Sequence, residues 1–570
     1  MAQAARSLEP RPTQPRPAHS ARGSSLGSAG TFASAMSSAG MKADGGAHCR
    51  SFAFVFPMAS GHINPSLPIA RSLVKLGHRV HYLCREQMRE AIEDTGASFH
   101  SDVEHEPELY EGREPNLLGA MDDLKKEHGM EDASVIVAMC HLQEIMLEMA
   151  LPGIIRWLRL VRADAVVYCP LMNLEAAVAG RVLDIPAIAL LTTAGPGSAV
   201  TFFQEMLRAE GLEPEDLLEM RRSYKPLGDC IERLRAKYGA ALSIDGPMQP
   251  AGRLHALLES SLVLVTTCED MQDPMPPELA RLYRDAGVRF EAVGPLLDAQ
   301  GARRAAGHRY HAEERERGER QSAEGQPDPV ALVKEARGSG RTVVLVSMGT
   351  VITGDSPDFG WGARLLGVDG RPCGLTGAEL CRSAWGGAFD AFGAESAEEG
   401  PLLVVALGPQ PEPLGELAPP PNAVCMPVVP QVDVLMAGVD LFLTHGGQNS
   451  FTEALSVGAP VVVCPGFGDQ VVNAQKAADL GVGLQVARPT PAEGLEAEAA
   501  AAYRAKVRDA LREALAARLF REASAGCAER LRSAGGVPRA VALVQAACAI
   551  PGGPGAEGGG AGAVAHIAGA

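Results

Sequence analysis

His62 is the residue in the first half of the chain whose type and setting suit proton transfer. It lies in the turn 57–65, directly after the apolar run 52–56, which predicts a β-strand. Open α/β sheets bind ligands at the carboxyl ends of their strands, so this turn is expected to face a cleft. Imidazole can take up a proton near neutral pH, as a general base must. A solvated or capping histidine is the alternative at such a turn.

A second group of polar residues follows the strand predicted at 440–444. His445 and two glycines, including Gly447, come first, and Asn449 and Ser450 open a helix predicted over 448–457. Unpaired N–H groups and the positive end of the helix dipole attract anions there, so a phosphate can approach the glycines closely. His445, Asn449 and Ser450 can add donors. Asn449 or Ser450 acting only as the helix N-cap is the alternative.

Carboxylate and amide groups follow these anion-binding residues. Glu453 lies one helical turn after Asn449 and can accept hydrogen bonds from a ribose diol. After the next predicted strand, 461–464, Asp469 and Gln470 place an acid and an amide at the carboxyl ends of the strands. This pair suits the hydroxyls of a sugar, whereas Asp469 taken alone is more often an N-cap.

Strands and helices alternate through both halves of the chain, which predicts parallel α/β sheets. A mixed-charge, weakly apolar segment separates the halves, and a Gly-rich stretch at 354–374 is expected to be a surface loop. Residues 1–48 are predicted to be disordered or a targeting segment, because basic residues there outnumber acidic ones amid Ser and Ala. The predicted parts are 1–48, a first domain 49–298, a linker 299–340, a second domain 341–548 and a disordered tail 549–570.

Composition narrows the class of protein. The 570 residues suggest two large domains or more, and 46% hydrophobic with 21% charged residues excludes a wholly disordered chain. The net charge of −17 comes without a long basic stripe, so nucleic acid is not an expected partner. None of the 12 cysteines lies in a C-x-x-C pair, which favours a reducing, cytoplasmic setting without a zinc ribbon. No apolar run approaches the ~18 to 20 residues of a membrane span.

The polar residues of the second half resemble the donor-binding signature of the UDP-dependent glycosyltransferases, inverting family 1 enzymes of the GT-B fold. That fold consists of two Rossmann-like doubly wound domains that face each other across a cleft. The resemblance covers about residues 50 to 548. The matching segments are Ser347–Thr350, Glu291–Leu296, Pro430–Gln431, His445–Ser450, Glu453 and Asp469–Gln470, with Gly61, His62 and Pro65 in the first domain.

The resemblance implies a role for each matching residue. His445, Asn449 and Ser450 would hold the diphosphate at the helix N-terminus near Gly447, with help from Thr350. Glu453 would bind the ribose, Gln431 would lie beside the nucleoside, and Asp469 with Gln470 would bind the transferred sugar. His62 would deprotonate the acceptor, which favours its catalytic interpretation. Val428 stands where relatives usually carry a Trp that stacks on uracil.

The implied activity is transfer of a hexose, with glucose favoured, from a UDP-sugar to a hydroxyl of an apolar small molecule or lipid. The first domain would bind the acceptor and the second the UDP-sugar, which is a co-substrate; no cofactor or metal is expected. Relatives usually orient the histidine with an Asp, but Cys169 or Pro170 stands nearest to that position here. We hypothesise that Glu175 or Asn173 replaces it, because both follow the same predicted strand.

The residues leave three other functions as alternatives. The missing Asp favours a catalytically weak or inactive nucleotide-sugar-binding protein with a regulatory or scaffold role, whereas the retained His62 opposes it. A sugar-nucleotide epimerase would convert the donor without any acceptor. An NAD enzyme is disfavoured, because the first turn carries a single glycine in place of G-x-G-x-x-G.

Overall fold

The computed structural model describes residues 49–116, 118–246, 249–305, 328–356, 359–366 and 372–548. The predictions for residues 1–48 and 549–570 lie outside these ranges, as does the greater part of the predicted linker, 306–327. The domain boundaries given above therefore stay a prediction.

The first half of the chain forms a seven-stranded parallel sheet in the order β3-β2-β1-β4-β5-β6-β7. In the register of the two central strands, Val55 at the end of β1 pairs with Tyr168 at the end of β4. The turns that follow these two strands therefore meet at one edge of the sheet. The strands are β1 (Ser51–Val55), β2 (Arg79–Cys84), β3 (Ser98–Ser101), β4 (Ala165–Tyr168), β5 (Ala187–Leu191), β6 (Leu262–Val265) and β7 (Phe290–Ala292).

Helices cover both faces of this sheet, which explains why its central strands are apolar throughout. Along β1, Ala53 and Val55 belong to one core, and Phe52 and Phe54 to the core on the opposite face. The helices are α1 (Ser60–Ile63), α2 (Leu67–Lys75), α3 (Arg89–Glu93), α4 (Asp102–His105), α5 (Pro107–Tyr110), α6 (Met121–Glu127), α7 (Val135–Leu160), α8 (Leu174–Leu183), α9 (Ser198–Glu210), α10 (Pro214–Ser223), α11 (Lys225–Tyr238), α12 (His255–Leu258) and α13 (Pro277–Asp285).

The second half repeats this plan with a six-stranded parallel sheet in the order β12-β11-β8-β13-β14-β15. Its strands are β8 (Val343–Ser347), β11 (Leu402–Ala406), β12 (Ala423–Met426), β13 (Leu441–Thr444), β14 (Val461–Val463) and β15 (Gly483–Gln485). Its helices are α15 (Pro329–Gly338), α16 (Gly377–Phe392), α17 (Gln431–Gly438), α18 (Gln448–Ser456), α19 (Asp469–Asp479), α20 (Glu496–Ala516) and α21 (Arg518–Ser533). The prediction of two parallel-sheet α/β domains is confirmed.

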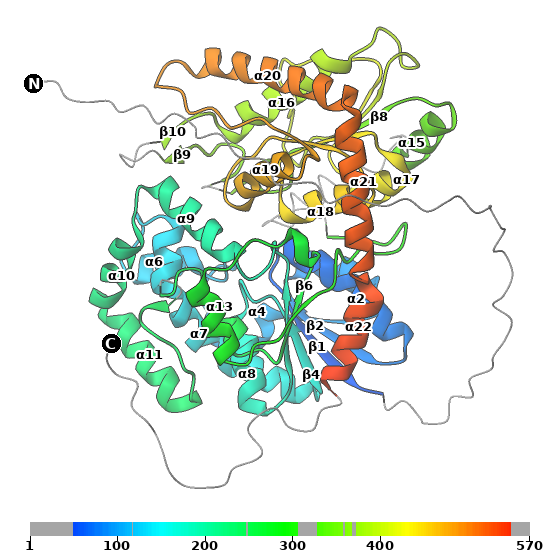
Figure 1. Cartoon of the computed structure of the whole chain (residues 1–570). Helices are drawn as coiled ribbons and strands as arrows, with labels where there is room; N and C mark the ends of the chain where they lie inside the picture. The colour runs from blue at the N-terminus through cyan, green and yellow to red at the C-terminus, as the bar shows by residue number, and fades with distance from the viewer. Residues whose placement is uncertain are drawn as a thin grey trace, which may run out of the picture. The chain divides into compact units, whose positions relative to one another are not determined.

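The last helix, α22 (Gly536–Ala547), returns to the first sheet, where it lies beside α2 (Figure 1). Ala540, Val541 and Val544 join the core that contains Phe52, and Arg50 Nη1 donates to the carbonyl of Gln545 at 2.8 Å. This helix lies within the range predicted for the second domain, yet it packs on the first, because its apolar side chains complete the core beside β1.

The Gly-rich stretch 354–374 is not only a loop. Within it, β9 (Leu365–Leu366) pairs antiparallel with β10 (Pro372–Cys373), so the expectation of a simple surface loop is corrected in part. Among the residues that the structure describes, no helix combines the length and the apolar character that crossing a membrane requires.

Candidate functional site

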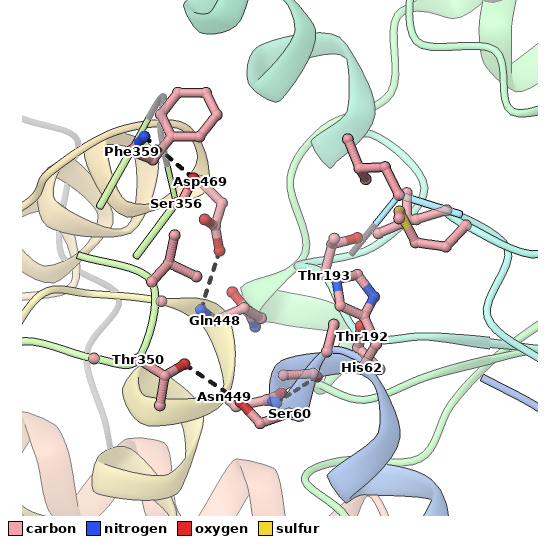
Figure 2. A pocket seen from close by; sticks show the side chains of 18 of the residues that line it. Ser60, His62, Thr192, Thr193, Thr350, Ser356, Phe359, Gln448, Asn449 and Asp469 are labelled. Carbon is pink, nitrogen blue, oxygen red and sulfur yellow. Dashed lines mark hydrogen bonds between the residues drawn. The ribbon is translucent and has the colours of Figure 1, made fainter. Parts of the chain in front are cut away.

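A cavity of about 1530 Å³ is lined by residues of both sheets' loops (Figure 2). Every site residue predicted from the sequence lines it: His62, Thr350, Gln431, His445, Gly447, Asn449, Ser450, Glu453, Asp469 and Gln470. The reason is topological, since these residues follow the carboxyl ends of parallel strands, where the loops of such sheets gather. Their individual roles stay predictions.

His62 lies in α1, the short helix that begins five residues after β1 ends. Its Nδ1 atom lies 3.1 Å from the sulfur of Cys169, the first residue after β4. Burial raises the pKa of the Cys169 thiol to about 12, so this neighbour is a neutral thiol at physiological pH. The Cys169 sulfur therefore faces the imidazole at the position where relatives usually carry the orienting Asp.

The hypothesis that Glu175 or Asn173 takes the orienting position needs correction. Asn173 Nδ2 donates to Glu175 Oε1 at 2.8 Å, and burial raises the pKa of the Glu175 carboxyl to about 7. The two candidates thus pair with each other, and the group placed against Nδ1 of His62 is Cys169. Because β1 and β4 are adjacent, the residue directly after β4 lies close to the histidine. Glu175 lies further along the chain, in the first turn of α8.

Two threonines on the histidine side of the cavity were not predicted. Thr192 and Thr193 directly follow β5 and line the cavity together with His62 (Figure 2). The signal was present in the sequence, because a short apolar strand is followed there by Thr-Thr-Ala-Gly-Pro-Gly. Their hydroxyls offer hydrogen bonds to a bound acceptor.

His445 stands between β13 and α18 and is half-buried in the wall of the cavity. Burial lowers its pKa to about 4, so the ring is neutral at physiological pH and can donate one hydrogen bond. Its Nδ1 has no hydrogen-bond partner among the described residues. The ring packs so closely on Gly349 and Gly447 that a Cβ at either glycine would collide with its Nε2 atom.

Gly349→Ala is expected to lower the free energy of unfolding by roughly 2 kcal/mol or more and to weaken UDP binding. Gly349 has φ +78°, and an added methyl would push His445 out of place. Urea denaturation and calorimetric titration with UDP measure the two effects. Gly340→Ala is the matched control, because Gly340 has φ +75° with no atom near its would-be Cβ. Equal losses in both variants would trace the effect to backbone strain alone.

The amino terminus of α18 is capped from outside its own sequence. Gly447 occupies the N-cap position without a side-chain bond, and Asp469 Oδ2 accepts from the N–H of Gln448 at 3.1 Å. The alternative in which Asn449 or Ser450 caps the helix is thus not observed. Asn449 Nδ2 donates to the carbonyl of Gly61 at 2.6 Å, which joins this helix to the loop of His62.

Glu453 is buried, with 5% of its surface exposed, and is engaged by two donors. Its Oε2 accepts from Gln431 Nε2 at 2.7 Å, and its Oε1 accepts from Arg304 Nη2 at 2.7 Å. Gln431 Nε2 also lies 3.0 Å from Ser450 Oγ. Arg304 comes from the segment predicted to be a linker. Its guanidinium therefore forms an ion pair with the Glu453 carboxylate, which the sequence predicted to bind ribose.

Arg304→Gln is expected to tighten UDP binding by about threefold to tenfold. If Glu453 binds the ribose hydroxyls, the ion pair with Arg304 must first open, and this requirement reduces the fraction of competent molecules. Calorimetry of UDP binding measures the change. Arg303→Gln is the control, because Arg303 also lines the cavity but pairs with the exposed Glu90, which does not line it. Weaker binding in Arg304→Gln would show that Arg304 itself holds the nucleotide.

Asp469 and Gln470 begin α19 after a left-handed Gly468. Burial raises the pKa of the Asp469 carboxyl to about 6. Gln470 Oε1 accepts from the N–H of Gly466 at 2.8 Å, so its amide group is left to face the cavity as a donor. In the loop after β8, Thr350 Oγ1 lies 3.3 Å from Ser60 Oγ of the first domain.

The described residues hold no group of three or more His, Cys, Asp or Glu side chains arranged to bind a metal ion. The expectation that no metal takes part stays a prediction.

Residues 406–500 match the family model described as UDP-glucoronosyl and UDP-glucosyl transferase. The uncharacterized UDP-glucosyltransferase YdhE of Bacillus subtilis is 23% identical over 442 residues, 76% of this chain and 84% of that relative. The NDP-glycosyltransferase YjiC of Bacillus licheniformis is 23% identical over 430 residues, 75% of this chain and 82% of that relative.

Solved structures show the same architecture. The glycotransferase of kitacinnamycin is similar with a TM-score of 0.54 and 22% identity, over 88% of this chain and 99% of that chain. The calicheamicin glycosyltransferase CalG4 is similar with a TM-score of 0.54 and 19% identity, over 88% and 98% of the two chains. At such identities the likeness concerns the fold, which is the predicted GT-B arrangement.

Proposed function

We propose that the chain is a UDP-glycosyltransferase that transfers a hexose, glucose by preference, from a UDP-sugar to a hydroxyl of an apolar acceptor, as its similarity to the family model and to the named relatives supports. The observation that carries the proposal is that His62 and the predicted donor residues line one cavity from opposite domains. The relatives are named as transferases, so the alternative of an inactive nucleotide-sugar-binding protein is not supported.

In the proposed mechanism His62 takes the proton of an acceptor hydroxyl at Nε2 while its Nδ1 faces Cys169. The acceptor oxygen forms a bond to the anomeric carbon as the bond from that carbon to the diphosphate breaks, which inverts the configuration. The diphosphate leaves with the electron pair of that bond. The positive end of α18, the neutral His445 and the hydroxyl of Thr350 stabilise the negative charge that develops on it.

The first-domain part of the cavity suits an apolar acceptor. Phe202, Phe203 and Met206 of α9 line it, and Thr192 and Thr193 lie near His62 to orient a hydroxyl. Burial of the acceptor body against these side chains would supply binding energy away from the reacting atoms. This division of the cavity supports an acceptor that combines an apolar body with at least one hydroxyl.

The test is UDP release from UDP-glucose in the presence of a panel of hydroxylated apolar compounds. We expect release that depends on the acceptor, and faster release from UDP-glucose than from UDP-galactose or UDP-glucuronate. Conversion of the donor without any acceptor would favour an epimerase. Binding of UDP without transfer from any of the donors would contradict the proposal.

UDP-glucose binding is expected to weaken as the pH falls through about 6, by up to tenfold per pH unit. The carboxylate of Asp469 accepts hydrogen bonds from sugar hydroxyls, and protonation removes this capacity. Because burial raises its pKa, the loss occurs at higher pH than for an exposed aspartate. Calorimetry without acceptor measures the profile. Asp469→Asn should bind weakly without this pH dependence, whereas Asp355→Asn, on another part of the cavity wall, should retain it.

A further inference from the structure

One wall of the cavity carries polar groups that the proposed transfer does not use. The loop 249–254 and the first turn of α9 form this wall, and both belong to the first domain. The two segments are in contact, because a Cβ placed on Gly252 would lie 2.7 Å from the backbone nitrogen of Val200. Arg253 and Ser198 line the cavity from these segments.

Arg253 has a guanidinium group without an anion. Its Nε atom is buried without a hydrogen-bond partner, and no carboxylate among the described residues forms an ion pair with it. The nearby Asp245 is paired with Arg222 at 3.0 Å, and the Tyr283 hydroxyl accepts from the N–H of Leu254 at 2.9 Å. Burial lowers the pKa of Arg253, and the nearby Tyr283 and Asp245 offset this effect only in part.

Ser198 supplies a second unused donor. Its side chain is buried, with 4% of the residue surface exposed, and its hydroxyl has no hydrogen-bond partner among the described residues. As the first residue of the 13-residue helix α9, it stands at the positive end of the helix dipole. Buried polar groups in proteins are normally hydrogen-bonded, so an unpartnered hydroxyl facing a cavity indicates a ligand.

Two other basic side chains that line the cavity are each paired with a carboxylate. Arg221 is fully buried and pairs with Glu144 at 2.7 Å, and His255 Nε2 lies 3.1 Å from Glu259 Oε1. These pairs leave Arg253 as the uncompensated charge of the wall within the described residues. An arriving anion would therefore meet attraction from Arg253 without repulsion from a neighbouring free carboxylate.

We infer that Arg253 and Ser198 form a subsite for a carboxylate of the acceptor. The inference rests on the proposed function, since it assigns the anion to the molecule that receives the sugar. The guanidinium binds the two carboxylate oxygens through parallel hydrogen bonds, and the Ser198 hydroxyl donates a third. The acceptor is then an amphiphile with a hydroxyl directed to His62, an apolar body beside Phe202 and Met206, and a carboxylate at its far end.

Straight-chain hydroxy acids, with the hydroxyl and the carboxylate at opposite ends, test this inference against primary alcohols of the same chain lengths. Calorimetry without donor gives the affinities. We expect the wild-type protein to bind the best hydroxy acid about tenfold or more tightly than the matching alcohol. Arg253→Gln should lose this difference, and Ser198→Ala should reduce it by about threefold. Alcohol affinities should not change in either variant.

A matched control and a stability measurement separate binding from structure. Arg233→Gln removes an exposed guanidinium that pairs with Glu148 away from the cavity lining, and it should leave the preference for hydroxy acids intact. Arg253→Gln should be at least as stable as wild type in urea, because it removes an unpaired, partly buried charge. Equal weakening of acids and alcohols, or a clear loss of stability in Arg253→Gln, would overturn the inference.

Transfer assays with UDP-glucose distinguish failure of the inference from failure of the proposed function. Transfer to alcohols and hydroxy acids alike, with no dependence on Arg253, would overturn the subsite and leave the glycosyltransferase proposal standing. Binding of hydroxy acids that depends on Arg253, without transfer to either series, would support the subsite as an anion site and contradict its assignment to an acceptor.

Discussion

His62→Ala is expected to lower kcat for sugar transfer by about 10² to 10⁴, because general-base catalysis contributes a factor of this size. Without the imidazole, the acceptor hydroxyl must lose its proton to water while it attacks the anomeric carbon. The second domain should be unaffected, since the link between the domains here runs from Asn449 to the backbone carbonyl of Gly61 and does not need the His62 side chain. Steady-state UDP release at saturating acceptor measures kcat.

UDP binding by His62→Ala should remain within about twofold of wild type, which shows that the loss concerns the chemical step. His78→Ala is a matched control, because His78 lies in the turn before β2 and contacts Arg50 and Gln545 outside the cavity. Its kcat should stay close to that of wild type. Transfer by His62→Ala at the wild-type rate would remove His62 from the mechanism and leave the choice of base open.

Cys169→Asp is expected to raise kcat by about tenfold or more. The thiol that faces Nδ1 of His62 at 3.1 Å is neutral, so it cannot stabilise the imidazolium formed during proton transfer. A carboxylate at this position supplies a negative charge next to the ring and fixes the tautomer in which Nδ1 carries the proton and Nε2 acts as the base. Since Cys169 directly follows β4 at the edge where His62 lies, and the Asp carboxylate extends one bond farther from Cβ than the thiol sulfur, the carboxylate can reach Nδ1.

The pH profile distinguishes this electrostatic effect from a change in packing. A carboxylate beside the ring favours the protonated imidazole and raises the pKa of His62, so the base form is lost at a higher pH. The acid limb of kcat/KM should therefore move to higher pH in Cys169→Asp, while the plateau above it rises.

Cys169→Asn is the matched control for Cys169→Asp, because it has a similar shape and no charge. It should show neither the gain in kcat nor the shift of the acid limb. A folded Cys169→Asp variant with a lower kcat and an unmoved acid limb would show that the residue at 169 does not act through His62. Thermal unfolding of both variants verifies that they are folded, since residue 169 is buried.

Much of the fold could be predicted from the sequence. The apolar runs of β1, β13 and β14 are short, bounded by turns and followed by helical periodicity, and such a pattern determines a parallel α/β sheet with little ambiguity. The candidate site followed from the same rule, because loops after parallel strands meet at one edge. His62, His445 and Asp469 were all found on the cavity that this rule predicts.

Contacts between residues far apart in sequence could not be predicted. In the sequence Cys169 or Pro170 stood nearest to the missing Asp position, with Glu175 a few residues beyond, and only the pairing of β1 with β4 put the sulfur against His62. Likewise, Arg304 lies in a segment whose composition predicted a linker. Its ion pair with Glu453 depends on where the chain crosses between the domains, which the sequence did not indicate.

The sequence by itself thus determined the residue types, their local elements and the end of each sheet at which they lie, because these depend on hydrogen bonding and periodicity over a few residues. Tertiary structure alone decided which side chains are paired and which are left without a partner. Arg253 and Ser198 are ordinary residues in the sequence, and they become notable only because packing buries them against a cavity without supplying an acceptor for their hydrogen bonds. Burial is a collective property of the folded chain, and so are the pKa values that follow from it.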